Sequence, residues 1–229
     1  MGEAMAGAVK RTRNRAETET RLLEAVERLL VRGGFGAITP SAVGREAGTD
    51  KMLIYRYYGG LDGLMHAVVD RPGFFPGLED LCAGEREGLR ALPAPERGRL
   101  VLQRFVEALA RSPVALELMA WEIVERNALT AVAEEARERL GLQIITELFG
   151  DEDKATMAAV TALLASALTY LLLRRRKITT FDGLDLHSQA SWDLFLDTAA
   201  RMIEGVLAQP HDPDLLGAMH GKAVRIENN

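Results

Sequence analysis

The sequence predicts an all-α protein, because leucine and alanine abound, aromatic residues are few, and hardly any run alternates apolar with polar side chains. Of its 229 residues, 48% are hydrophobic, 27% charged and 6% aromatic, a balance typical of a soluble globular protein. Strands would show period-two alternation bounded by turn residues, and we find neither that pattern nor a hairpin signal. The length suffices for one substantial core or two modest domains.

The first sixty residues predict three short helices separated by glycines. Five apolar residues of the first helix recur at helical spacing: Leu22, Leu23, Val26, Leu29 and Leu30. That stripe ends at Gly33 and Gly34, where a left-handed cap has no steric cost. Thr39 and Pro40 predict the start of a second helix, since threonine can N-cap and proline suits the first helical position. Gly48 ends this helix.

The third helix, which Asp50 can cap, carries basic and aromatic side chains within two turns. Two short helices joined by a tight turn are typical of a helix-turn-helix, whose second helix enters the major groove of DNA. Lysine and arginine can donate to guanine, Met52 can touch a thymine methyl, and tyrosine hydroxyls suit phosphate. The candidate DNA contacts are Thr39, Ser41, Lys51, Met52, Tyr55, Arg56 and Tyr57. Tyr55 can equally serve packing, and we expect Leu53, Ile54 and Tyr58 in the core.

Charge is distributed unevenly along the chain. Residues 1–58 hold ten lysines and arginines against seven acidic residues, a net charge of +3; because the whole chain has −5, the remainder carries −8. A basic reader on an acidic body suits DNA binding with weak non-specific adhesion. The stretch from Lys10 to Arg15 predicts a disordered basic arm. It is either a solvated tail or an arm whose Arg11 and Arg13 contact phosphate or the minor groove.

The segment from Arg21 to Leu64 resembles the N-terminal domain of the TetR family of bacterial transcriptional repressors. The resemblance rests on the RLLEAVERLL helix, the GGF turn, the ITPSAVGREAG helix and the IYRYY end of the third helix. It implies that three helices form the DNA-binding unit. A fourth helix would link that unit to a C-terminal helical domain for ligand binding and dimerisation.

Two positions depart from the family pattern. Members often carry a phosphate-contacting lysine near the start of the fourth helix, where this chain has Leu61 after Gly59 and Gly60. Many place a Gly-Thr pair in the recognition helix, where this chain has Met52 and Leu53. The usual phosphate contacts are therefore in question, although the backbone N–H groups after Gly60 can still bind phosphate at a helix N-terminus.

The rest of the chain predicts a helical body. We expect a fourth helix over 61–70, and further helices over 78–89, 95–111, 113–127, 128–148, 153–176 and 188–208. This organisation divides the chain into a basic flexible arm (1–15), a helix-turn-helix domain (16–60), a ligand-binding and dimerisation domain (61–208) and a weakly ordered tail (209–229).

The helices over 153–176 and 188–208 are candidates for a dimer interface. Small residues on the first let another helix approach closely, and the pair can form half of a four-helix interface. The candidate interface residues are Ala158, Ala162, Leu164, Leu168, Trp192 and Phe195. Two reading heads about one DNA turn apart would match a palindromic operator. The alternative is that the first helix is an intrachain core helix.

The remaining signals concern location. The run over 158–173 is the most apolar, but it is shorter than the roughly 20 residues a membrane span needs, so we expect a buried helix and no membrane partner. The single cysteine, Cys82, excludes an internal disulfide and fits a reducing cytoplasm. No signal peptide is visible in the first fifteen residues.

The resemblance also implies a ligand pocket in the body. The candidate lining residues are Phe105, Met119, Trp121, Glu122, Glu125 and Tyr170. An apolar cavity with a stray carboxylate suits a hydrophobic small molecule, neutral or cationic. Trp121 can equally be plain core, and Glu122 and Glu125 can be solvated.

The leading hypothesis is a cytoplasmic homodimeric repressor that a small-molecule effector releases from a palindromic operator. An activator is not distinguished from a repressor. The alternatives are a helical adaptor that kept the fold and lost DNA binding, which the Leu61 departure favours, and, least supported, an enzyme. The four histidines are scattered, no P-loop or nucleophile elbow is present, and we expect no metal and no cofactor.

Overall fold

The computed structural model describes residues 2–71, 73–124 and 128–209, and the described residues form eleven α-helices, one 3-10 turn and a two-stranded hairpin. The head consists of α1 (Gly2–Gly33), the turn η1 (Phe35–Ala37), α2 (Pro40–Glu46), α3 (Met52–Tyr58) and α4 (Leu61–Val69). The body consists of α5 (Leu78–Cys82), α6 (Arg86–Ala91), α7 (Ala94–Ala110), α8 (Pro113–Val124), α9 (Ala128–Leu148), α10 (Lys154–Arg175), β1 (Thr180–Phe181), β2 (Leu184–Asp185) and α11 (Gln189–Ala208). The all-α prediction is confirmed.

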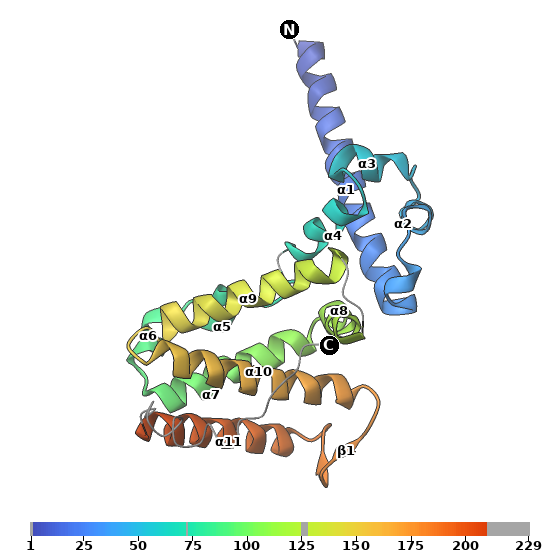
Figure 1. The fold of residues 1–229 in the computed structure, drawn as a ribbon. Helices are drawn as coiled ribbons and strands as arrows, with labels where there is room; N and C mark the ends of the chain where they lie inside the picture. Colours follow the sequence, from blue (N-terminus) through green and yellow to red (C-terminus); the bar gives the residue numbers. More distant parts are fainter. Residues whose placement is uncertain (1, 72, 125–127, 210–229) are drawn as a thin grey trace, which may run out of the picture.

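Head and body share one continuous core. Figure 1 shows α2 and α3 beside the long α1, with the N-terminal end of α1 projecting beyond them and the body helices stacked below. The buried stripe of α1 packs on Val43 of α2 and Ile54 of α3. The same cluster takes in Leu118 of α8 and Val132 of α9. The recognition helix is therefore packed, through α1 and α4, on the body.

Two glycines allow the head helices to approach closely. A Cβ on Gly44 of α2 would lie 3.0 Å from the backbone nitrogen of Lys51, so a side chain there would push the two helices apart. A Cβ on Gly63 would lie 1.9 Å from the carbonyl oxygen of Tyr58, which fixes the tight entry into α4. In the turn that connects α2 to α3, Gly48 has φ +63°, a conformation that glycine adopts without strain.

Three predictions about helices are wrong. Residues 2–15, expected to be a flexible arm, continue α1 as helix. The single helix expected over 78–89 is broken into α5 and α6, because Ala83 (φ 50°) and Gly84 (φ 76°) turn the chain left-handed between them. The apolar helix expected to be buried, α10, has only 22% of its most apolar window buried.

The hairpin was also missed. The strand β1 pairs antiparallel with β2, with Phe181 opposite Leu184. The turn between them is Asp182-Gly183, both with positive φ, and Asp-Gly is a strong signal for a two-residue hairpin turn. The signal was present, but strands of two residues show no alternation that would have drawn attention to it.

Candidate nucleic-acid interface and ligand cavity

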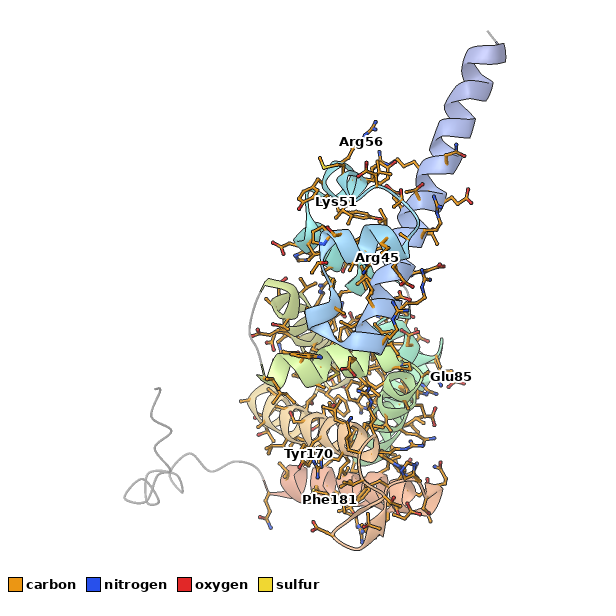
Figure 2. The ribbon with its side chains drawn as sticks, turned by 90° about the vertical axis from the view of Figure 1, so that its right-hand side faces the viewer. Arg45, Lys51, Arg56, Glu85, Tyr170 and Phe181 are labelled. Carbon is orange, nitrogen blue, oxygen red and sulfur yellow. The ribbon has the colours of Figure 1, made fainter. Side chains whose placement is uncertain are left out.

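The exposed surface formed by α2 and α3 of the head carries three basic side chains. Arg45, Lys51 and Arg56 lie on the head, at the end of the molecule away from Tyr170 (Figure 2), and all three are exposed. No acidic side chain among the described residues pairs with any of them. The surface is therefore positive and unneutralised, as binding to phosphate requires.

Polar backbone contacts hold this surface in shape. The Thr39 hydroxyl accepts a hydrogen bond from the Ala42 N–H (3.2 Å), which caps α2. The Asp50 carboxylate accepts one from the N–H of Met52 (2.8 Å), the first residue of α3. Both contacts were expected from the sequence. Because caps of this kind are worth about 1 kcal/mol each, they fix where the recognition helix begins.

An ion-pair cluster fastens α2 to α1. Glu46 accepts hydrogen bonds from Arg28 (2.9 Å) and Arg32 (2.6 Å). The two guanidinium groups, Arg32 first, lower the pKa of the Glu46 carboxyl below its ordinary value of 4.5. Arg28 and Arg32 therefore attach α2 to α1 through Glu46. Because they are already paired with a carboxylate, they are less available to bind DNA phosphates than the unpaired basic side chains of the head.

The predicted DNA contacts differ in accessibility. Met52 is 59% exposed and Tyr55 49% exposed, while Ser41 and Thr39 are exposed at the start of α2. These positions belong to α2 with its N-cap and to α3. Tyr57 is only half-buried.

The tyrosines at the end of α3 are partly used for packing. The Arg15 guanidinium lies over the ring of Tyr57, 4.9 Å from its centroid, and donates to Glu19 at 2.8 Å. Burial raises the pKa of Tyr58 to about 12, so its hydroxyl stays protonated. We therefore find the expected core role for Tyr58, and an additional packing role for Tyr57.

Arg45 was missed as a candidate contact. It follows Ser41 by four residues, and residues four apart share a helix face, so the choice of Ser41 already pointed to it. The side chains of Arg11 and Arg13, the two arm candidates, lie outside what the structure describes.

Leu61 has a packing role in this chain. It is half-buried and packs against the head core. Its helix begins at Gly60 with no side-chain cap. The first N–H groups of α4 are thus left without a side-chain acceptor, in keeping with the expectation that phosphate can reach them.

A cavity of about 610 Å³ lies in the body between α7, α8, α9 and α10. Three of the predicted pocket residues, Phe105, Met119 and Tyr170, line it. Apolar side chains make up most of its wall, and the charged lining residues all come from α9: Glu134, Arg137 and Glu138. This volume falls within the ordinary range for small-molecule sites.

Trp121 does not line the cavity, and its assignment to the pocket is wrong. Its ring faces the head, 6.4 Å from the ring centroid of Phe35, and a Cβ on Gly34 would lie 2.7 Å from its Nε1. That nitrogen donates to Glu117 at 3.2 Å. Met119 of α8 faces the cavity, whereas Trp121 of the same helix packs on the core of the head. Trp121 therefore belongs to the junction between head and body.

Glu122 also differs from its prediction, because it neither lines the cavity nor lies in solvent. Arg137 donates to its carboxylate. Burial raises the pKa of Glu122, although Arg137 opposes the shift. One buried atom of each partner, Glu122 Oε2 and Arg137 Nε, has no hydrogen-bond partner. The sixth pocket candidate, Glu125, lies outside the described residues.

The predicted interface residues separate into two groups. Ala158 and Ala162 are exposed, and Leu164 and Phe195 are half-buried. Leu168 (4% exposed) and Trp192 (6% exposed) are packed in the core of their own chain, so assigning them to an interface is wrong. Trp192 donates from Nε1 to the Leu186 carbonyl at 2.8 Å, which ties α11 to the hairpin.

Exposed apolar residues nevertheless line both helices. On α10, Leu163 is 72% exposed, with Ala159 exposed one helical turn before it; Tyr170, which is 46% exposed, also lines the cavity. By length and composition α10 is the one described helix that could cross a membrane.

Within the described ranges no group of three or more His, Cys, Asp or Glu side chains could hold a metal ion. The Cys82 thiol is buried, which raises its pKa.

Comparisons with known proteins agree with this architecture. Residues 22–68 match the family described as bacterial regulatory proteins, tetR family. A search of curated proteins returned no significant match.

Solved structures resemble the chain over most of its length. They include the multidrug binding protein EbrR complexed with imidazole, with 20% identity and a TM-score of 0.56, covering 84% of this chain and 96% of that one. A TetR-like transcriptional regulator from Rhodococcus sp. RHA1 has 21% identity and a TM-score of 0.53, covering 82% and 97%. A TetR transcriptional regulator from Agrobacterium tumefaciens has 17% identity and a TM-score of 0.50, covering 82% and 93%. Residues 22–68 are therefore similar to the DNA-binding segment of the tetR family of bacterial regulatory proteins, and the described chain shares the fold of these solved structures.

Proposed function

We propose that this chain is a cytoplasmic, homodimeric transcriptional repressor that releases a palindromic operator when a small molecule enters the body cavity. The observation that carries the proposal is the exposed basic surface formed by Arg45, Lys51 and Arg56 on a helix-turn-helix head. In this proposal the helix-turn-helix DNA-binding domain spans residues 16–60, and the ligand-binding and dimerisation domain spans residues 61–208.

The head supplies both kinds of contact that sequence-specific reading needs. Arg45 and the start of α4 would bind phosphates and set the register. Lys51, Met52 and Arg56 on α3 would reach base edges in the major groove. The exposed Tyr55 would add a phosphate contact through its hydroxyl.

A second copy would cover the exposed apolar residues of α10 and α11. Leu163 on α10 is matched on α11 by Leu194 (45% exposed) and Met202 (55% exposed), which are two helical turns apart. Leaving such stripes in water is unfavourable by about 25 cal/mol per Å² of apolar surface. A dimer through these two helices would also present two heads to one palindrome.

Helix α8 offers a physical route from cavity to head. Met119 and Ile123 line the cavity, whereas Leu118 and Trp121 of the same helix pack on the head core. A ligand that displaces Met119 and Ile123 would also move Leu118 and Trp121, because all four lie on one helix. The Trp121 ring packs so closely on Gly34 that its movement would shift the head. The ligand would act by binding more tightly to the conformer whose heads no longer fit the operator.

Similar proteins support a small-molecule effector. EbrR, whose structure the body resembles, has been solved with imidazole and with malachite green. We therefore favour a regulator over an enzyme or a DNA-free adaptor.

The decisive experiment is a titration of the purified protein with the DNA upstream of its own gene, beside a shuffled control, at several salt concentrations. We expect selective binding that weakens steeply with salt, the slope giving the number of phosphates contacted. A selection from randomised DNA follows if both DNAs bind equally. Failure to enrich any sequence there would contradict the proposal and favour the adaptor.

A further inference from the structure

We infer that the effector is a hydrophobic cation, whose apolar part fills the body cavity and whose positive group lies near Glu138 and the ring of Tyr170. The inference rests on the proposed function, since it names the ligand class of the same cavity. It depends on the apolar wall, the charges on α9 and the aromatic ring at the α10 side.

The wall of the cavity selects an apolar body. Phe105 and Leu102 of α7, Met119 of α8 and Ile144 of α9 all line it. With about 610 Å³ available, it can hold a ligand of drug size, and burying such a body against apolar walls is the main source of affinity.

The charges of the wall favour a positive group. Arg137 is the only basic side chain among the described residues that line the cavity, and its guanidinium already donates to Glu122. That pair is neutral as a unit, and the other two charged lining residues, Glu134 and Glu138, are both carboxylates. Glu138 is exposed and has no partner among the described residues. A cation entering the cavity thus meets an available carboxylate.

An anion would meet the opposite situation. To reach Arg137 it would have to displace Glu122, leaving a buried carboxylate without its cation, which is costly. It would also approach between Glu134 and Glu138 of the same helix. The free Nε of Arg137 can instead donate to a neutral oxygen of the ligand.

The aromatic ring of Tyr170 supplies a second contact for a cation. Tyr170 lines the cavity and is held edge-on by Phe181 of the hairpin, with ring centroids 5.9 Å apart (Figure 2). A cation over the face of an aromatic ring is attracted by the ring quadrupole. The hairpin therefore fixes the orientation of a ring that a cation can use.

Three probes with the same naphthyl body test the inference: 1-naphthylmethyl-trimethylammonium, 1-naphthylmethanol and 1-naphthylacetate. Binding to the full-length protein is measured by calorimetry. We expect the ammonium compound to bind about tenfold more tightly than the alcohol, and the acetate most weakly. If the alcohol or the acetate binds as well as the ammonium compound, the inference is wrong.

Variants on α9 then assign the charge. Glu138→Gln should weaken the ammonium compound about fivefold and leave the alcohol unchanged. The matched control is Glu135→Gln, which removes the same charge from the same helix at an exposed position that does not line the cavity. Arg137→Gln should act in the opposite direction and strengthen the ammonium compound. Equal effects of Glu138→Gln and Glu135→Gln would overturn the assignment.

Failure of the inference is distinguishable from failure of the proposed function. If the alcohol binds best and releases operator DNA, the regulator stands and its ligand is neutral. If the ammonium compound binds but operator DNA stays bound at saturation, the cavity chemistry stands and the control mechanism fails.

Discussion

At the scale of single residues, the proposed function assigns base reading and positioning on DNA to different side chains of the head. Lys51 is exposed at the start of α3 with no acidic partner among the described residues, where its ammonium can reach a base edge. Tyr55 is half exposed one helical turn on, and its hydroxyl suits a phosphate. The two side chains should therefore fail in different ways when they are changed.

Lys51→Ala should relax the base preference of the protein, because a lysine that donates to guanine discriminates between bases by about 1–3 kcal/mol. Tyr55→Phe should weaken binding to all DNA to about the same extent, since it removes a phosphate contact. Both are measured by titrating operator and mismatched DNA. The control is Arg175→Ala, which removes a positive charge from the body. Unchanged binding in both α3 variants would contradict the role of this helix.

At the scale of elements, the attachment of α2 to α1 depends on ionisation. Arg32 and Arg28 lower the pKa of Glu46 below 4.5. A carboxyl whose pKa is lowered by folding stabilises the folded state above its unfolded pKa. That stabilisation is lost as the pH falls through the lowered value.

Glu46→Gln should therefore lower the melting temperature of the protein at pH 7, and the difference from the parent should vanish at an acidic pH below the lowered pKa of Glu46. Thermal unfolding followed by circular dichroism at both pH values measures this. Glu24→Gln is the control, because Glu24 contacts Arg28 only at 3.7 Å and its side chain is 46% exposed. A difference that persists unchanged in acid would contradict the ionic attachment.

The elements of the head were predictable because their signals are local. Thr39 and Asp50 accept hydrogen bonds from backbone N–H groups two or three residues further along the chain, and Gly48 adopts a positive φ between α2 and α3. Each of these roles follows from the residue type and its position. The break at Ala83 was missed because a left-handed alanine is uncommon, and the adjacent Gly84 looked like one weak residue in a helix.

The candidate site was only partly predictable, for a tertiary reason. Nearly every residue of α8 is apolar, so periodicity cannot tell which side of the helix faces the cavity and which faces the head. Met119 and Trp121 therefore received the same assignment, although they lie on opposite sides. Leu168 and Trp192 raised the same difficulty, since burial within a chain and burial between chains select the same residue types.

At the scale of the whole molecule, the proposed dimer would be formed by the exposed apolar residues of α10 and α11. Leu163→Lys should weaken the proposed dimer about tenfold or more, because a leucine side chain contributes about 1.5–3 kcal/mol when buried. Sedimentation over a range of protein concentrations measures the change. Val31→Lys is the control, since Val31 is 52% exposed on α1 of the head. A Leu163→Lys protein that stays dimeric would place the interface elsewhere.

The positions of the two tryptophans give the molecule a built-in optical reporter. Trp121 lies at the junction of head and body against Phe35, and Trp192 lies buried in the body beside Phe195. A Trp192→Phe protein would emit from the junction alone, so its fluorescence would follow the head moving on the body in real time. The close contact between Trp121 and Gly34 thus makes regulation visible by spectroscopy, without any added label.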